Sequence, residues 1–199
     1  MLSRAKPAAE RALGPVAILF RHVNPNTITI FGLVFPILFF VFVAEGLYIL
    51  ALVALILCGL DMVDGMIARR ENKVSAFGAF LDSTIDRVAD FAIITAFGFA
   101  DLVHWYVVLP FLLFAYLTSY VRSRIELASK ERNDKLLAGV GFLERPERII
   151  GIGIALFAYW LFPNVTLWDQ NILGLLFIVL TALSAITVWQ RFAFAKKNL

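Results

Sequence analysis

The chain has 199 residues, of which 61% are hydrophobic and only 17% are charged. A soluble domain is about half apolar and about a quarter charged, so this composition excludes an ordinary soluble protein and predicts a single integral membrane domain over residues 1–199. The net charge of +3 indicates attraction to anionic lipid headgroups rather than to nucleic acid, because no basic stripe is interleaved with aromatic residues. The single cysteine, Cys58, excludes an internal disulfide.

The first predicted element is an amphipathic helix at residues 2–22. Basic residues alternate there with apolar ones, a pattern typical of a helix that lies on the cytoplasmic surface of a membrane. A basic tail without regular structure is the alternative. No signal peptide is expected, because charged residues interrupt the apolar run before it is long enough to form one.

Six apolar stretches follow, each close to the roughly 20 residues that cross a bilayer as a helix. The first has a start signal, because Asn24 can cap a helix that has Pro25 at its first position; Asn26 is the other candidate cap. The predicted fold class is all-α, with the surface helix followed by a bundle of six transmembrane helices within residues 24–192. The expected spans are 27–44, 47–68, 77–99, 105–126, 147–162 and 171–191.

The connections between these spans are of two kinds. Lys and Arg occur in the N-terminal segment, at 69–73, across 122–148 and at the C-terminal end. The connections near residue 45, at 101–104 and at 163–170 contain acidic residues but no Lys or Arg. Because positively charged loops stay on the cytoplasmic side, we expect both termini and the loops after the second and fourth spans to be cytoplasmic.

Four aspartates, Asp61, Asp64, Asp82 and Asp86, lie where the neighbouring sequence is typical of membrane helix. The first two are three residues apart and the last two are four apart, so each pair shares one helix face. Since the pairs flank one cytoplasmic loop, two antiparallel helices would bring the four carboxylates together. Such a cluster is costly unless cations compensate its charge, and hard divalent ions such as Mg²⁺ or Mn²⁺ suit carboxylate oxygens. A helix pair held by salt bridges to arginines is the alternative.

Small residues accompany the aspartates. Gly65 directly follows Asp64, Ala68 lies four residues after Asp64, and Gly78 precedes Asp82 by one turn. These positions leave room for another molecule to approach the helix backbone, although close packing between helices also explains small residues, above all at Gly78. A carboxylate–metal site with room beside it fits phosphoryl transfer, in which metal ions neutralise phosphate oxygens.

In chain order, these residues give the pattern Asp61-x2-Asp64-Gly65-x2-Ala68-Arg69-x8-Gly78-x3-Asp82-x3-Asp86. The pattern resembles the signature of the CDP-alcohol phosphotransferase family, whose fold also has six spans after an N-terminal surface helix. The resemblance implies that two divalent ions, Mg²⁺ or Mn²⁺, are bound by the four aspartates and the pyrophosphate of a CDP-lipid. It implies that an alcohol attacks the β-phosphate and releases CMP, with Asp86 also acting as the general base. It further implies a homodimer.

The same resemblance assigns a nucleotide site. Carried over position by position, Gly65, Ala68, Arg69 and Gly78 would line the CMP group. The segment "NPNTIT" at 24–29 resembles the family's sequence at the start of the first span, which would place Asn26 and Thr29 near the nucleotide.

Basic residues at 118–148 and at 191 bear on the acceptor alcohol. Arginines at the cytoplasmic level of the aspartates suggest an anion site, since a guanidinium fork suits a phosphate monoester; anchoring of the helices by positive charge is the alternative. The stretches "SYVRSR", "GFLERPERII" and "WQR" resemble the phosphatidylinositol-phosphate synthases of actinobacteria and their archaeal counterparts. This resemblance implies inositol 1-phosphate as the acceptor, held by Arg122, Arg148 and Arg191.

Two other functions stay open at this point. Glycerol 3-phosphate also carries a phosphate, and as acceptor it would make the protein a phosphatidylglycerophosphate synthase. A transporter could use intramembrane carboxylates along a cation or proton path, but the aspartates gather near one membrane face instead of spreading through its depth. The donor could be CDP-diacylglycerol or CDP-archaeol. In either case we expect a multi-pass protein of the cell membrane whose active site faces the cytoplasm.

Overall fold

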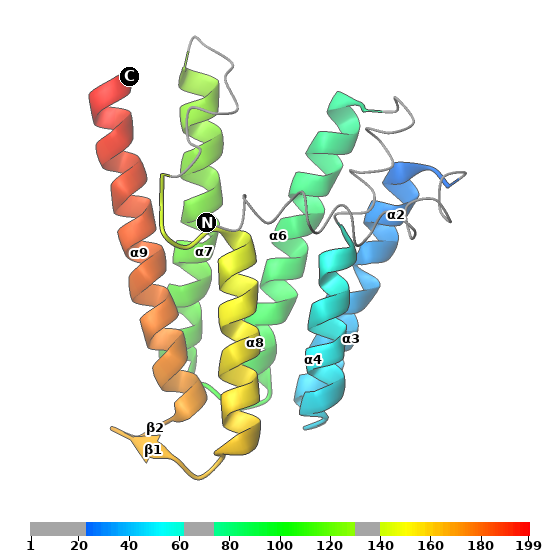
Figure 1. Ribbon diagram of the computed structural model, residues 1–199, viewed down its shortest axis with the longest axis vertical. Helices are drawn as coiled ribbons and strands as arrows, with labels where there is room; N and C mark the ends of the chain where they lie inside the picture. The colour runs from blue at the N-terminus through cyan, green and yellow to red at the C-terminus, as the bar shows by residue number, and fades with distance from the viewer. Residues whose placement is uncertain (1–22, 62–73, 130–139) are drawn as a thin grey trace. The chain divides into compact units, whose positions relative to one another are not determined.

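The computed structural model describes residues 23–61, 74–129 and 140–199 (Figure 1). These residues form two compact units, an N-terminal unit that ends at Ala100 and a C-terminal unit that begins at Asp101. The predicted surface helix at 2–22 lies outside the described residues and stays a prediction.

The N-terminal unit begins with the predicted start signal. Asn24 is the N-cap of the first helix, its side chain accepts a hydrogen bond from the Asn26 backbone N–H at 3.0 Å, and Pro25 is the first helical residue. The first span is divided at Leu33, because Pro36 has no N–H to donate to the carbonyl of Gly32. The elements of this unit are α2 (Pro25–Gly32), α3 (Val34–Ala44), α4 (Tyr48–Leu57), the 3₁₀ turn η2 (Cys58–Asp61) and α6 (Ala76–Phe99).

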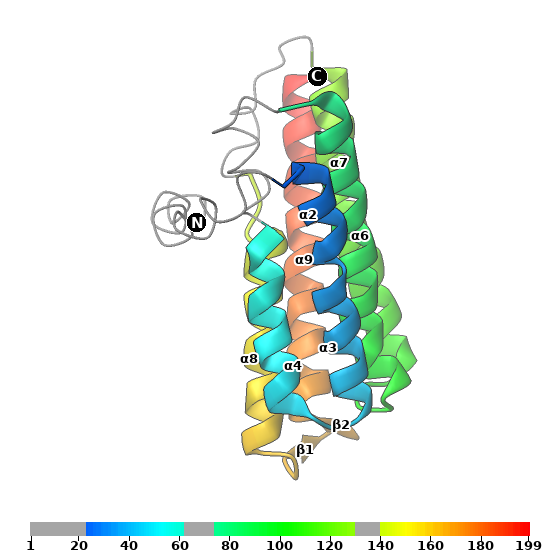
Figure 2. The same ribbon diagram turned by 90° about the vertical axis from the view of Figure 1, so that its right-hand side faces the viewer.

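Aromatic side chains hold α3 against α6 in this unit. Phe39 packs edge-on against Phe97 with ring centroids 5.8 Å apart, and both side chains are fully buried. α3 also contacts α4, which runs back beside it after a tight turn at Gly46 (Figure 2). α2 contacts both η2 and α6, so the three elements that carry or approach the predicted nucleotide residues lie together.

The described part of the C-terminal unit consists of three long helices and a small hairpin. α9 packs against both α7 and α8, and Phe111 of α7 meets Phe177 of α9 edge-on at 5.0 Å between ring centroids. The hairpin lies between α8 and α9 at one end of this unit (Figure 1). The elements are α7 (Trp105–Ala128), α8 (Arg145–Leu161), β1 (Thr166–Leu167), β2 (Gln170–Asn171) and α9 (Ile172–Asn198).

The hairpin is a departure from the predicted all-α fold. Leu167 pairs with Gln170, and the two residues between them, Trp168 and Asp169, have φ angles of 51° and 60°. Positive φ at both loop positions is what a tight two-residue hairpin turn requires, but neither residue is the glycine that would signal it in a sequence. The Asn171 side chain then caps α9 by accepting a hydrogen bond from the Gly174 N–H at 2.8 Å.

Each of the six predicted spans contains a helix among the described residues. Three of these helices are long and apolar enough to cross a membrane: Pro25–Ala44, Trp105–Ala128 and Ile172–Asn198. α6 is long but carries four charged residues, α8 has 17 residues, and α4 has 10 because the predicted span 47–68 continues beyond the described part of the chain. The mostly helical fold is therefore confirmed, whereas six complete membrane spans and a cytoplasmic location of both termini remain predictions.

Candidate active site

The start of α6 brings two of the predicted nucleotide residues together. Ser75 caps this helix by accepting a hydrogen bond from the Gly78 N–H at 3.0 Å. A Cβ atom at Gly78 would lie 3.2 Å from Asn26 Oδ1 and 3.1 Å from Ser75 Oγ. Because Gly78 has no side chain, the Asn26 side chain can lie against the start of α6. Close packing between helices therefore explains at least part of the need for glycine at this position.

Asp82 and Asp86 follow Gly78 by one and two turns of α6. Asp82 is exposed and Asp86 is partly exposed, so both carboxylates are near the surface of their unit. Asp86 Oδ2 lies 3.7 Å from Arg87 Nη1, which donates a hydrogen bond of 2.8 Å to the Ser83 carbonyl on the same helix. Such a long, partly exposed ion pair contributes little stability.

The partner aspartates are described only in part. Asp61 ends η2, which contacts α2, but its side chain lies outside the described residues, as do Asp64, Gly65, Ala68 and Arg69. Within the described part of the chain, no group of three or more His, Cys, Asp or Glu could hold a metal ion. The two described aspartates have the right chemistry, since carboxylates four residues apart on one helix are hard oxygen donors suited to Mg²⁺ or Mn²⁺.

Thr29 has contacts within its own helix. It is buried in α2, and its hydroxyl donates a hydrogen bond of 3.0 Å to the carbonyl of Pro25. Its predicted place at the nucleotide, like that of Asn26, stays a prediction.

The three predicted acceptor arginines all belong to the C-terminal unit, one from each of its long helices. Arg191 of α9 and Arg148 of α8 are buried, with exposed fractions of 2% and 0%. Arg122 of α7 has a side chain that is 44% exposed. Two buried guanidinium groups in one small helical unit are costly, and a protein retains such groups only where counter-charge and hydrogen bonds compensate them.

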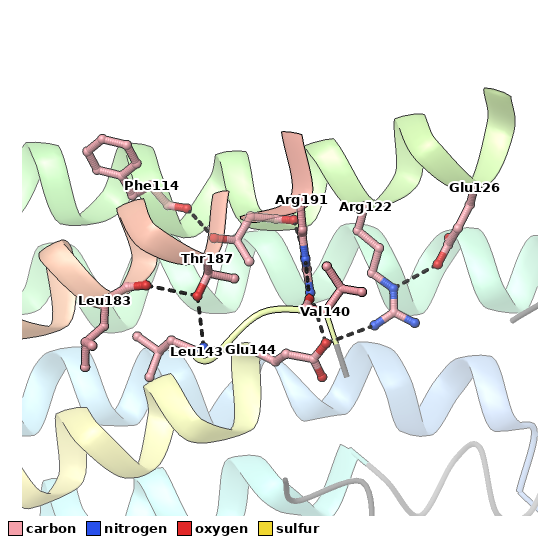
Figure 3. Close-up of polar contacts among 10 residues, drawn as sticks. Phe114, Arg122, Glu126, Val140, Leu143, Glu144, Leu183, Thr187 and Arg191 are labelled. Atoms are coloured by element: carbon pink, nitrogen blue, oxygen red, sulfur yellow. Dashed lines mark hydrogen bonds and ion pairs between the residues drawn. The ribbon is translucent and has the colours of Figure 1, made fainter. Parts of the chain in front are cut away.

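Arg191 is held by three hydrogen bonds (Figure 3). Its Nε donates to the Val140 carbonyl at 3.2 Å, and its Nη1 donates to the Thr118 carbonyl of α7 at 2.6 Å. Its Nη2 donates to Glu144 Oε1 at 2.9 Å. The guanidinium therefore joins α9 to α7 and to the loop before α8.

Glu144 connects this group to Arg122. The same Oε1 atom lies 3.8 Å from Arg122 Nη1, while Arg122 Nε donates to Glu126 Oε1 at 2.8 Å along α7 (Figure 3). Arg122 and Arg191 are thus brought together by one carboxylate. Sequence reasoning did not single out Glu144 and missed this contact. The signal was its place at the N-cap of α8, where Glu is a poor cap and its side chain makes no capping bond.

The loop 140–144 is fitted closely onto α9. Gly141 has a φ angle of +120°, and a Cβ atom there would lie 2.6 Å from Thr187 Cγ2. The Leu143 N–H donates to Thr187 Oγ1 at 3.0 Å, and that hydroxyl donates to the Leu183 carbonyl at 2.9 Å (Figure 3). Gly141 and Thr187 therefore determine where Val140 and Glu144 meet Arg191, a role that the sequence did not reveal.

Comparison with known proteins identifies the relatives of this chain. The family model described as CDP-alcohol phosphatidyltransferase matches residues 22–189. The archaetidylinositol phosphate synthase of Pyrococcus horikoshii is 34% identical over 202 residues, which cover 100% of this chain and 98% of that protein.

Two crystal structures of the phosphatidylinositol phosphate synthase PgsA1 of Mycobacterium tuberculosis have the same fold. The structure with CDP-DAG bound matches with a TM-score of 0.75 and 26% identity, over 93% of this chain and 94% of that chain. The structure in complex with manganese and citrate matches with a TM-score of 0.76 and 25% identity, over 92% of this chain and 88% of that chain.

Proposed function

Because the chain belongs to the CDP-alcohol phosphatidyltransferase family, we propose that it transfers a phosphatidyl or archaetidyl group from a CDP-lipid to inositol 1-phosphate and releases CMP. Membership makes the chain an enzyme, so the transporter alternative is set aside. The observation that carries the choice of acceptor is the pair of buried arginines, Arg148 and Arg191, the second of which shares Glu144 with the half-exposed Arg122. An uncharged alcohol would give these buried charges no function.

The aspartates would serve the donor substrate. We assign Asp61, Asp64, Asp82 and Asp86 to two divalent cations, Mg²⁺ or Mn²⁺, in line with the manganese complex of the structural relative. When bound, these ions would neutralise the pyrophosphate oxygens of the CDP-lipid. Asn26, Thr29, Gly65, Ala68, Arg69 and Gly78 are the proposed nucleotide residues.

The reaction needs one proton to be moved. The acceptor hydroxyl attacks the β-phosphorus, a new P–O bond forms, and the bond between the β-phosphorus and the oxygen bridging to the α-phosphate breaks to release CMP. Asp86 would take the hydroxyl proton, because a base that acts as the P–O bond forms increases the nucleophilicity of the alcohol. Its partly exposed position on α6 is compatible with that role.

The arginines would serve the acceptor. A phosphate monoester bound by Arg122, Arg148 and Arg191 would be held in a fixed orientation, since guanidinium–phosphate bonds are directional and strengthened by charge. Burial of two of them increases the strength of each contact, because the surroundings screen charge less than water does. Glycerol 3-phosphate would satisfy the same arginines, and the similarity to archaetidylinositol and phosphatidylinositol phosphate synthases favours an inositol phosphate over it. We further propose a homodimer in the cell membrane with its active site toward the cytoplasm.

An acceptor panel tests the proposal directly. Purified full-length protein is incubated with CDP-lipid and Mg²⁺ and with inositol 1-phosphate, glycerol 3-phosphate or free inositol, and CMP release and lipid products are measured. We expect turnover with inositol 1-phosphate, little with the other two, and none after chelation of divalent ions by EDTA. Preferential use of glycerol 3-phosphate would establish the alternative acceptor. If free inositol were used as well as inositol 1-phosphate, the arginines would not be needed to bind an acceptor phosphate.

A further inference from the structure

Glu144 links the arginines of α7 and α9 through a single oxygen atom. Its Oε1 accepts a hydrogen bond from Arg191 Nη2 at 2.9 Å and lies 3.8 Å from Arg122 Nη1. Although Glu144 is the N-cap residue of α8, its side chain makes no bond to that helix. The carboxylate is therefore directed at the two arginines instead of at the backbone of its own helix.

The three acceptors of Arg191 differ in how easily they can be exchanged. The carbonyls of Thr118 and Val140 belong to the backbone, one within α7 and the other in the loop held by Gly141 and Thr187. Glu144 is a side chain that is 33% exposed, and it can leave by rotation about its own bonds without any change of backbone. Of these three contacts, the one with Glu144 is the easiest for an incoming anion to replace.

Charge balance gives a reason for this arrangement. Arg191 is 2% exposed, and a buried guanidinium without a counter-charge is strongly destabilising. A phosphate and a carboxylate cannot share the same arginine edge, because like charges at such short range repel one another. The buried arginine therefore needs a counter-anion at all times, and two anions on the same edge of its guanidinium would repel each other.

We propose that Glu144 occupies the place of the acceptor's phosphate group in the acceptor-free protein and is displaced when the acceptor binds. This inference rests on the proposed function, because it requires Arg122 and Arg191 to be ligands of that phosphate. Until the acceptor binds, Glu144 keeps both guanidinium groups in position.

Displacement also makes Glu144 a determinant of specificity. A phosphate dianion can replace the carboxylate, since it carries more charge and more acceptor oxygens for the same donors. A neutral polyol cannot neutralise Arg191, so it leaves Glu144 in place. The cost is a lower apparent affinity for the true acceptor, because only the fraction of protein with Glu144 displaced can bind it.

The test is the isosteric variant Glu144→Gln in the full-length protein, reconstituted in lipid nanodiscs and loaded with CDP-lipid. Gln keeps the size and one hydrogen-bond acceptor but carries no charge, so it competes less well for the arginines. We expect inorganic phosphate to inhibit the variant competitively against inositol 1-phosphate with a Ki about five- to tenfold lower than in wild type. Phosphate should also raise the Tm of the variant more than that of wild type. An unchanged or higher Ki would overturn the proposal.

Glu126→Gln is the matched control. Glu126 also pairs with Arg122, at 2.8 Å, but its side chain is 42% exposed, and the hydrogen bonds of Arg191 go to Thr118, Val140 and Glu144 instead. We expect its Ki for phosphate to change less than twofold. A decrease as large as that of Glu144→Gln would mean that loss of any nearby negative charge strengthens phosphate binding, and that displacement of Glu144 is not the cause. If the Gln variant does not fold, Glu144→Asp decides the question. Its shorter side chain cannot keep the 2.9 Å contact, so phosphate must again bind more tightly than in wild type.

Failure of this inference can be told apart from failure of the proposed function. If wild type used free inositol as readily as inositol 1-phosphate and phosphate did not inhibit it, the acceptor assignment itself would be wrong. If wild type required the phosphorylated acceptor and Arg191→Ala raised its KM while Glu144→Gln left the Ki unchanged, only the displacement of Glu144 would be wrong.

Discussion

Replacement of Gly141 by alanine should weaken acceptor binding without touching an arginine. Gly141 has a φ of +120°, which L residues rarely adopt, and the new Cβ would lie 2.6 Å from Thr187 Cγ2. Backbone strain of this kind costs about 1–3 kcal/mol, and overpacking costs about 1–3 kcal/mol as well. We therefore expect a loss of about 2–6 kcal/mol in the free energy of unfolding if the loop stays in place, and less if it moves.

Movement of the loop has a functional consequence. The loop carries the Val140 carbonyl and Glu144, which are two of the three acceptors that hold Arg191. A shift away from Thr187 would release this arginine from its position, so the KM for inositol 1-phosphate should rise about tenfold while the KM for the CDP-lipid stays the same. Steady-state kinetics with each substrate varied in turn, together with thermal unfolding in nanodiscs, measure both effects.

Gly46→Ala is the control for this prediction. Gly46 also has a positive φ, +73°, but a Cβ there would meet nothing within 4 Å, and the residue lies in the turn between α3 and α4. It should lower the Tm through backbone strain and leave both KM values unchanged. A Gly141→Ala protein that unfolds at a lower temperature, yet has the wild-type KM for inositol 1-phosphate, would refute the role of this loop in positioning the acceptor site.

Three further predictions concern the two sites and the topology. Asp82→Asn should abolish metal-dependent turnover in membrane-inserted protein. Asp86→Asn should still bind the CDP-lipid but lose turnover, because its main loss is proton abstraction. An equal loss of CDP-lipid binding in both variants would contradict a separate role of Asp86 as base. Arg191→Ala should raise the KM for inositol 1-phosphate about ten- to hundredfold. Arg124 is exposed and lies two residues from Arg122, so Arg124→Ala should leave this KM unchanged if the position of the charge decides binding. Single cysteines at 101–104 should react with impermeant reagents only from the outside, and labelling from the cytoplasm would reverse the predicted orientation.

Local signals in the sequence predicted the helices well. The cap at Asn24 with Pro25 after it is confirmed, and α6, α7 and α8 lie within a few residues of the predicted spans. α9 begins where predicted but continues to Asn198, beyond the predicted end at 191. The division of the first span at Leu33 was missed, although Pro36 gave a signal for it. The hairpin at 166–171 was missed because its turn begins with Trp168 at positive φ, where a sequence normally shows Gly, Asn or Asp.

The contacts around the arginines could not be predicted in the same way. Arg191 was selected from its charge and from a resemblance, but its bonds to Thr118 and Glu144 join residues 73 and 47 positions apart. No periodicity or spacing relates such residues, because the contacts follow from how α7, α8 and α9 pack. The roles of Glu144 and Thr187 therefore appeared only in the structure.

The hydrogen bonds at the two ends of α9 restrict how the C-terminal unit can move. The Asn171 side chain donates to the Leu102 carbonyl at 2.7 Å just before α7, and Arg191 donates to the Thr118 carbonyl at 2.6 Å within α7. The two attachment points on α9 are 20 residues apart, about 30 Å of helix. Sliding of α9 along α7 by one turn, about 5.4 Å, would break both bonds at once. α7 and α9 should therefore move as one rigid body during turnover. The rearrangements that admit and release the acceptor should then be confined to the start of α8.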